Sequence, residues 1–351
     1  MNQHTHPPTM QNPRRMLIIK PSSLGDVTTA LPLLCDLKKR FPNAQIDWMI
    51  HPLLTDLIQG HDALNEIIPF DRDEISGWWF KPHAMNILRQ LVGKLRQNKY
   101  DVIFDAQGLL RSALLAWLSG ARVRIGAADA REGAVWFYTH KVNISREEQL
   151  AVVRMRSLQT PFGPVQGSAE FRMPVQSEAL AGVKKLIPAN KPVAAIIPGA
   201  RWHAKRWSEE GFIQIGHHLT AEHFCVLILG DPRERDLCEQ IVTRIGPNAV
   251  NLAGRTSLAQ MVAAIWFAKI VIGNDSGPLH VAAALGRSLV GLYGPTDPAS
   301  VGPYGQMDHV LHFQQSGDYR NNQVVDRSAA LASLPAEKVW ELIQGILVEC
   351  R

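Results

Sequence analysis

The sequence predicts an α/β protein built from two doubly wound domains, and three observations favour this class. Short apolar runs alternate with amphipathic stretches along the chain, an order typical of parallel sheets covered by helices on both faces. The 351 residues exceed the length of about 250–300 residues at which a single hydrophobic core stops growing. An aperiodic segment rich in Pro and Gly, residues 160–176, separates two similar halves, and we interpret it as the linker.

Each half repeats the same local pattern of an apolar run followed by an amphipathic stretch. The strands expected in the first half are residues 16–20, 45–50, 66–69 and 100–105, and its helices are residues 27–40, 84–96 and 109–118. The strands expected in the second half are residues 193–197, 224–229, 269–273 and 288–293, and its helices are residues 209–219, 236–245, 258–267 and 278–285. Residues 329–348 indicate a closing helix pair.

Several classes of protein are disfavoured by composition. The polar stretch of residues 1–15 has no apolar core, so it predicts a disordered leader in place of a signal peptide. No uninterrupted run of about 18 apolar residues occurs, which disfavours a membrane-spanning helix. Cys35, Cys225, Cys238 and Cys350 lack a CxxC spacing, so neither a disulfide framework nor a zinc site is expected. We therefore expect a cytoplasmic protein.

The net charge is mildly basic. The formal charge of +5 comes from 37 Lys and Arg residues against 32 Asp and Glu residues. This balance permits an anionic partner such as a phosphate or a phospholipid surface, without choosing between them. No long basic run with interleaved aromatic residues is present, which disfavours nucleic acid as the partner.

The first candidate site is the loop KPSSLGD, which joins the first expected strand to its helix. The backbone N–H groups of Ser22, Ser23 and Gly25 can face an anion here, and Gly25 permits a close approach. Asp26 ends the loop and has two interpretations. It can cap the helix and interact with the helix dipole, or its carboxylate can be the general base for a hydroxyl nucleophile.

The second candidate site is the loop PGARWHAKRW, which lies between an expected strand and a helix of the second half. The loop places Arg201, Lys205 and Arg206 at the carboxyl end of the strand. Cations in this position suit a diphosphate, whose charge grows as it leaves. The alternative is a solvated basic turn with its two tryptophans packed on the surface.

The third candidate site is the motif GNDSGPLH, which follows the buried strand KIVI. Asp275 or Ser276 can cap the following helix, and Pro278 suits its first turn. Gly277 removes a side chain where a ligand would approach, and the helix N-terminus offers free N–H groups and a positive dipole end to a phosphate. His280 lies in the first turn. In the alternative interpretation, Asp275 is only a cap and His280 is a structural histidine.

These three motifs, with GPTDP after the third, resemble those of glycosyltransferase family 9, the ADP-heptose–lipopolysaccharide heptosyltransferases. The motifs DAQGLLRSA and ADAREG are similar too, and they point to the heptosyltransferase I branch. The resemblance implies a GT-B fold, in which two Rossmann-like domains face a central cleft. Residues 16–165 would bind the acceptor and residues 176–320 the nucleotide sugar, and residues 321–351 would form a helical tail that packs back on the first domain.

The resemblance also implies the chemistry, an inverting and metal-independent transfer of heptose from ADP-heptose to a Kdo-bearing lipopolysaccharide inner-core acceptor. Asp26 would deprotonate the acceptor hydroxyl, while Lys205 and the helix start would stabilise the departing ADP. The implied donor-binding residues are Ser23, Gly25, Arg201, Glu234, Asp275, Ser276, Gly277, Pro278 and His280. The implied acceptor-binding residues are Gln107, Arg131 and Arg154. No cofactor is expected, and the acceptor would be an anionic lipid A/Kdo molecule at the inner membrane surface.

Three positions depart from the pattern of the family: Arg201 stands for a threonine, Pro278 for a leucine and Leu150 for an acceptor-side histidine. These departures concern the acceptor and the donor sugar more than the reaction. Two other functions stay open, a transferase of the same fold with a protein or another core sugar as acceptor, and a non-catalytic nucleotide-binding protein. The intact Asp26, Lys205 and NDSGPLH motif argue against the non-catalytic protein.

Other motifs carry less weight. The DxD of Asp71 and Asp73 could hold a metal ion, although a solvated turn is the commoner structure. The sequence contains no GxxxxGK[ST], no GxGxxG after the first strand and no HExxH, which disfavours a P-loop NTPase, a dinucleotide oxidoreductase and a zinc protease. The cluster Trp78-Trp79-Phe80 favours contact with a membrane or with lipid A over a packed loop, so the protein would be peripheral on the membrane.

Overall fold

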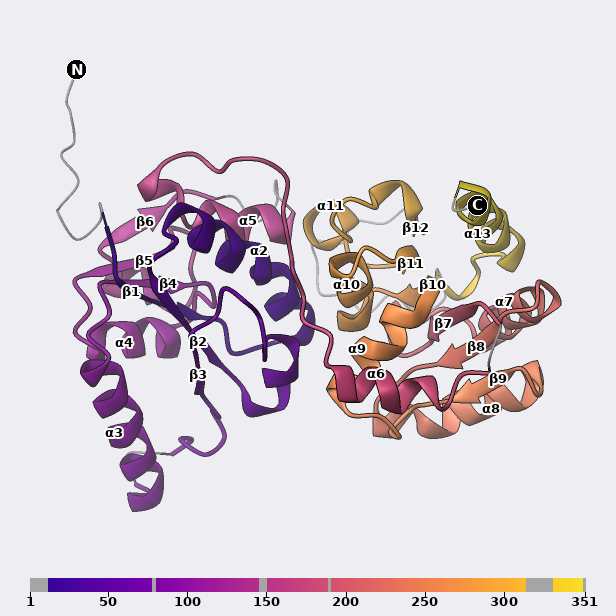
Figure 1. Cartoon of the computed structure of the whole chain (residues 1–351), viewed down its shortest axis with the longest axis horizontal. Helices are drawn as coiled ribbons and strands as arrows, with labels where there is room; N and C mark the ends of the chain where they lie inside the picture. The colour runs from indigo at the N-terminus through magenta and orange to yellow at the C-terminus, as the bar shows by residue number, and fades with distance from the viewer. Residues whose placement is uncertain (1–11, 78–79, 145–149, 189–190, 314–330, 350–351) are drawn as a thin grey trace. The chain divides into compact units, whose positions relative to one another are not determined.

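The computed structural model describes residues 12–77, 80–144, 150–188, 191–313 and 331–349 (Figure 1). The chain divides into two compact units, Met1–Pro174 and Val175–Arg351. Each unit has one six-stranded sheet with flanking helices, so the predicted α/β class with two doubly wound domains is confirmed. Each unit is described by itself below.

The sheet of the first unit is entirely parallel and runs in the order β3-β2-β1-β4-β5-β6. Its strands are β1 (Arg15–Ile19), β2 (Gln45–Ile50), β3 (Glu66–Pro69), β4 (Val102–Asp105), β5 (Val123–Ala127) and β6 (His140–Val142). Its helices are α2 (Leu24–Arg40), α3 (Pro82–Gln97), α4 (Leu110–Leu118) and α5 (Ala151–Ser157), with 3₁₀ turns η1 (Pro52–Leu57), η2 (Ala134–Phe137) and η3 (Thr160–Phe162). Helix α2 packs with α5 and α3 with α4, one pair on each face of the sheet (Figure 1).

Two boundaries in the first unit differ from those expected. Strand β1 begins at Arg15, because the carboxylate of Asp101 accepts hydrogen bonds from the backbone N–H groups of Arg14 and Arg15 at 2.7 and 3.0 Å. The predicted leader, residues 1–15, is therefore too long, and residues 1–11 lie outside the described residues. Helix α2 begins at Leu24 in place of residue 27, because Ser23 is already its N-cap. The order of strands places the ends of β1 and β4 side by side, where the order of the sheet reverses.

The segment that we interpreted as a linker is fastened to the first unit along much of its length. Arg156 is 5% exposed, and its guanidinium pairs with Asp36 of α2 at 2.7 Å and donates to the carbonyls of residues 166 and 167. Arg40 donates to the carbonyls of Phe162 and Pro164 at 2.6 and 2.8 Å. These cations satisfy the backbone of a segment that has no secondary structure beyond η3. The chain passes to the second unit at residues 174–175.

The second sheet is also parallel and runs in the order β12-β11-β10-β7-β8-β9. Its strands are β7 (Val193–Ile197), β8 (Cys225–Ile228), β9 (Ala249–Asn251), β10 (Ala268–Asn274), β11 (Ser288–Tyr293) and β12 (Val310–His312). Its helices are α6 (Ser177–Lys184), α7 (Glu209–Ala221), α8 (Arg235–Ile245), α9 (Leu258–Phe267), α10 (Gly277–Ala284), α11 (Pro298–Val301) and α13 (Ala336–Glu349), with 3₁₀ turns η4 (His203–Lys205), η5 (Pro232–Glu234) and η6 (Met307–His309). The reversal of strand order places β7 and β10 side by side.

Helix α13, which is the main described part of the tail, packs within the second unit, and the expectation that residues 321–351 pack back on the first domain stays a prediction. Helix α13 lies beside α7 (Figure 1) and also contacts β11. Its apolar face, including Val339 and Ile343, belongs to the core around β7 and β8. The ring of Trp340 stacks on His218 of α7 at 4.7 Å. The apolar stripe of α13 is thus buried in its own unit. Residues 314–330 lie outside the described part of the chain, so only the second helix of the expected closing pair is described in full.

Candidate active site

The loop after β1 holds Asp26 by hydrogen bonds to its own helix start. One oxygen of the carboxylate, Oδ2, accepts from the backbone N–H of Ser23 at 3.0 Å and from the hydroxyl of Ser23 at 3.1 Å. The ammonium of Lys20, which is almost fully buried, lies 3.9 Å from the same oxygen. The Asp26 side chain is 53% exposed. All its hydrogen bonds within the described residues use Oδ2, so Oδ1 is available to a ligand.

The loop after β4 carries Gln107 and is built around a buried carboxylate. Asp105 accepts hydrogen bonds from the N–H groups of Gln107 and Gly108, both at 3.0 Å, from the Ser112 hydroxyl at 2.9 Å and from the Tyr138 hydroxyl at 2.7 Å. Complete burial raises the pKa of Asp105, against the hydrogen bonds that lower it. The Oε1 atom of Gln107 is buried and has no hydrogen-bond partner in the described structure. This orphan acceptor is available to a donor group of a ligand.

The two arginines expected at the acceptor differ in their surroundings. Arg154 is 9% exposed, and its guanidinium donates to the Ile144 carbonyl at 2.9 Å and to both carboxylate oxygens of Asp129 at 3.2 Å. Its hydrogen-bonding capacity is therefore largely used inside the first unit. The side chain of Arg131 is exposed, while its backbone N–H donates to the carbonyl of Gly108 at 3.0 Å. That bond joins the ADAREG motif to the DAQGLLRSA motif.

In the second unit, the buried amide of Asn274 holds both ends of the cationic loop after β7. Its Nδ2 donates to the Pro198 carbonyl at 2.8 Å, and its Oδ1 accepts from the Trp207 N–H at 3.0 Å. Asn274 is 0% exposed. Within the loop, Arg206 donates to the carbonyl of Ala200 at 3.0 Å. The side chain of Arg206 thus joins the two halves of the loop, and Asn274 fixes the loop to the end of β10.

The end of β10 brings Lys205 and the start of α10 together. The Lys205 ammonium donates to Oδ2 of Asp275 at 2.5 Å, and the two side chains are 23% and 7% exposed. The next residue, Ser276, is the N-cap of α10, and its hydroxyl is buried without a hydrogen-bond partner among the described residues. Gly277 and Pro278 open the helix. A cation, an unsatisfied hydroxyl and a helix N-terminus therefore meet at one place, an arrangement suited to a phosphate.

The other donor residues lie around the same strand ends. Glu234 ends the turn η5, where its Oε2 accepts from the Asp231 N–H at 2.9 Å. A Cβ atom at Gly199 would overlap the Glu234 carboxylate, so the glycine lets the two loops approach closely. Arg201 is exposed, with its guanidinium 5.9 Å from the ring of Trp202. His280 is partly buried in the first turn of α10.

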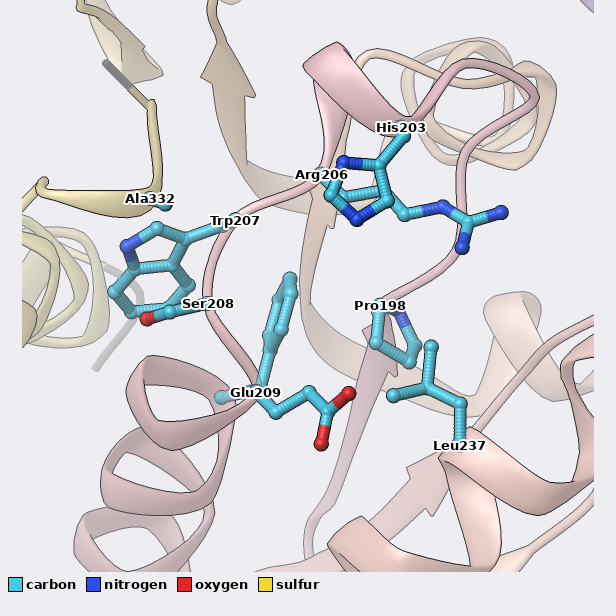
Figure 2. Close-up of a pocket in the computed structure, with 9 residues that line it drawn as sticks. Pro198, His203, Arg206, Trp207, Ser208, Glu209, Leu237 and Ala332 are labelled. Carbon is cyan, nitrogen blue, oxygen red and sulfur yellow. The ribbon is translucent and has the colours of Figure 1, made fainter. Parts of the chain in front are cut away.

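A pocket of about 290 Å³ lies beside the cationic loop. Figure 2 shows His203 and Arg206 of the loop on one side and Glu209, from the start of α7, on the other. Trp207 and Phe212 supply an apolar wall, and their rings meet edge to face at 5.0 Å. Of the described residues, neither Lys205 nor Asp275 is among those that line this pocket. It is therefore separate from the Lys205–Asp275 pair, and the sequence patterns did not predict it.

The remaining motifs have the following surroundings. In the DxD turn, the carboxylate of Asp71 accepts from the N–H of Asp73 at 2.8 Å and lies 3.7 Å from His51. Trp78 and Trp79 lie outside the described residues, and Phe80 is 64% exposed. Within the described ranges, no group of three or more His, Cys, Asp or Glu residues is placed to hold a metal ion. Among the helices of the described chain, none is both long and apolar enough to cross a membrane.

The chain is also similar to known proteins. Residues 88–328 match the family model described as glycosyltransferase family 9 (heptosyltransferase). The chain belongs to this family. It is therefore a glycosyltransferase, and the resemblance inferred from the motifs is confirmed.

The relatives cover most of the chain. Lipopolysaccharide heptosyltransferase 1 of Salmonella typhimurium is 30% identical over 83% of this chain and 92% of its own length. Lipopolysaccharide heptosyltransferase 2 of Escherichia coli is 27% identical over 95% of this chain and 99% of its own length. The structure of the E. coli heptosyltransferase WaaC with ADP has 26% identity and a TM-score of 0.78, covering 95% of this chain and 99% of its own. This likeness shows that the two α/β units form a GT-B fold.

We expect the Asn274 clamp to stabilise the loop that carries Lys205. In Asn274→Ala, the Pro198 carbonyl and the Trp207 N–H lose their partner, and each unsatisfied buried group costs about 1–3 kcal/mol. The free energy of unfolding should fall by about 2–4 kcal/mol in chemical denaturation. Amide hydrogen exchange across residues 198–207 should become faster.

Asn251→Ala is the matched control. Asn251 is 3% exposed and also ends a strand, and its amide bonds to Ala253 and Glu239 at 2.9 and 2.6 Å. Its loss should lower stability by a similar amount and leave exchange in residues 198–207 near the native rate. Equal exchange in the two variants would contradict a local clamp.

Proposed function

We propose that the protein transfers heptose from ADP-heptose to a Kdo-bearing inner-core acceptor of lipopolysaccharide, with inversion at the anomeric carbon and without a metal ion. Membership of the heptosyltransferase family and the two relatives named lipopolysaccharide heptosyltransferase support the substrate class. One observation of the site carries the proposal: Lys205, the unpartnered Ser276 hydroxyl and the N-terminus of α10 meet at the end of β10.

The donor diphosphate would bind at this meeting point. The Ser276 hydroxyl would gain the hydrogen-bond partner that it lacks, and the N–H groups of the first turn of α10 would face phosphate oxygens. Lys205 would move from Asp275 to the phosphates, and the Asp275 carboxylate would then accept hydrogen bonds from hydroxyls of the sugar. The negative charge of the departing ADP would be stabilised by fixed protein groups, which is the role that a metal ion has in other transferases.

The nucleoside end of the donor would lie toward Glu234. Gly199 has no side chain, which lets the Glu234 carboxylate approach the loop after β7. A carboxylate is a suitable acceptor for ribose hydroxyls. Arg201, Pro278 and His280 would complete the donor site, and in the first unit the N–H group of Gly25 and the hydroxyl oxygen of Ser23 would add to it.

Asp26 would be the general base. Its Oδ2 binds the helix start, which leaves Oδ1 to accept the proton of the acceptor hydroxyl. On the acceptor side, Gln107 and the exposed Arg131 would contact the anionic sugar. Arg154, which is tied to Asp129, would act mainly by holding this part of the first unit in place. The acceptor is an anionic lipid, so we place the reaction at the inner surface of the inner membrane.

The direct test is turnover of ADP-heptose with a Kdo-lipid A acceptor by the purified protein. We expect transfer that persists after chelation with EDTA and a product of inverted anomeric configuration by NMR. Transfer that stops in EDTA and returns with added metal would contradict the metal-independent mechanism. Transfer only to a protein or another core sugar would contradict the acceptor.

Replacing Lys205 tests the donor site. Lys205→Ala should lower turnover by about 10²–10³, the scale of losing one group that stabilises the transition state. It also leaves the buried Asp275 carboxylate unpaired, which by itself lowers stability. The double variant Lys205→Ala/Asp275→Asn removes that buried charge and should recover stability without recovering turnover. Unchanged rate and ADP affinity in Lys205→Ala would show that the lysine has no part in the reaction.

Replacing Asp26 separates its two roles. In Asp26→Asn, the amide oxygen can still accept from Ser23, and Asn suits helix starts, so the melting temperature should change little. Removal of the proton acceptor should lower the rate by about 10²–10⁴ at saturating donor and acceptor. Donor affinity should persist. A folded Asn variant with a near-native rate would mean that Asp26 only caps α2.

A further inference from the structure

The outer face of α4 and η2 is apolar and exposed. We define the α4–η2 face by three residues of one side of α4 and two of η2: Leu110, Leu114, Trp117, Trp136 and Phe137. The exposed fraction is 84% for Trp136, 52% for Trp117 and 42% for Leu110. The opposite side of α4 is buried in the first unit. Helix α4 is thus apolar on both sides, although only one side meets the core, which indicates a partner for the other side.

The α4–η2 face is held in shape by the surrounding structure. The rings of Trp117 and Phe137 meet edge to face at 6.1 Å, which joins the helix to the turn. The guanidinium of Arg124 donates to the Phe137 carbonyl at 2.7 Å and to the Ala121 carbonyl at 2.5 Å. Ala134, which is 0% exposed, anchors η2 against Ala113 of α4 and the ring of Tyr138. The exposed tryptophans therefore lie on a helix and a turn that are held together by these contacts.

The chain segment that forms the face carries more basic than acidic residues. Residues 106–142 contain five basic residues, Arg111, Arg122, Arg124, Arg131 and Lys141, and two acidic residues, Asp129 and Glu132. Asp129 pairs with the guanidinium of Arg154 at 3.2 Å, and the exposed Glu132 accepts a hydrogen bond from the Leu110 N–H at 3.3 Å. Four of the five basic residues are exposed, since only Arg124 is turned to carbonyls of its own unit. This segment therefore combines exposed aromatic rings with an excess of positive charge.

We propose that the α4–η2 face docks on the surface of an anionic lipid bilayer. Tryptophan is favoured at the boundary between headgroups and acyl chains, and arginine and lysine are attracted to anionic headgroups. A second copy of the chain is a poorer occupant, because a symmetric contact would bring the cations of both copies together. The docking itself does not depend on the reaction. Its use rests on the proposed function, in which a lipid-borne acceptor has to be reached at a membrane.

The test is flotation of the full-length protein with vesicles. We expect binding to vesicles of phosphatidylcholine with about 30% phosphatidylglycerol, at least tenfold weaker binding to pure phosphatidylcholine, and weakening by salt. Trp117→Ser/Trp136→Ser should lower binding at least tenfold, and Arg111→Glu/Arg122→Glu should do the same. Two controls should bind like the native protein: Trp266→Ser, which alters a 38% exposed tryptophan of the second unit, and Lys184→Glu/Lys185→Glu, which makes the same change in net charge elsewhere.

Activity separates this inference from the proposed function. With an acceptor stripped of its acyl chains, the variants of the face should turn over at the native rate, and with the same acceptor embedded in anionic vesicles they should be slower. A native protein inactive on both acceptors would refute the proposed function and leave the vesicle result to decide the docking. Native vesicle binding by the tryptophan variant would overturn the docking. A dimer in sedimentation that Trp136→Ser abolishes, without vesicle binding, would assign the face to a second copy.

Discussion

The geometry of the donor side depends on the end of β10, where two consecutive residues use their side chains in different ways. Both the amide nitrogen and the amide oxygen of Asn274 form hydrogen bonds with the backbone at the two ends of the loop 198–207. Asp275 then pairs with Lys205, which the same loop carries. Because the amide is fully buried, its hydrogen bonds are not exchanged for bonds to water, and the loop has one favoured position. The cation reaches Asp275 only because Asn274 first holds the loop over the strand end.

In the first unit, the carboxylate of Asp26 can both stabilise the start of a helix and take part in the reaction. Its Oδ2 completes the start of α2, and this bond fixes the direction in which Oδ1 points. The interpretation of Asp26 as a cap and its interpretation as a base are therefore compatible. A residue at the third position of a helix is rigidly placed, which is a requirement for a general base.

Much of the fold followed from the alternation of apolar runs and helical stretches, because strands buried on both faces, such as β1 and β10, are continuous apolar runs that stand out in a sequence. The strands that we did not predict are less distinctive: β5 (VRIGA) contains an arginine and a glycine, and β6, β9 and β12 have three residues each. The packing of α13 against α7 and β11 could not be predicted, because an amphipathic stripe shows that a helix packs, without showing on which elements.

The positions of the motif residues could be predicted from the sequence. Which of them bond within the protein and which are free to bind a ligand could not. Asp105, Asp129 and Asn274 lie within or beside recognised motifs, yet their side chains bond within the protein. Asp105 and Asn274 bond to the loops that carry Gln107 and Lys205, and Asp129 bonds to Arg154 of α5. Spacing along the chain does not distinguish such holding residues from those that meet a ligand, since both follow strand ends. Burial makes the distinction: Arg154 has a buried carboxylate-bound guanidinium, and Arg131, in the same expected role, is exposed. In each of these motifs, polar residues that bond within the protein thus hold in place the few side chains that are left free to bind a ligand.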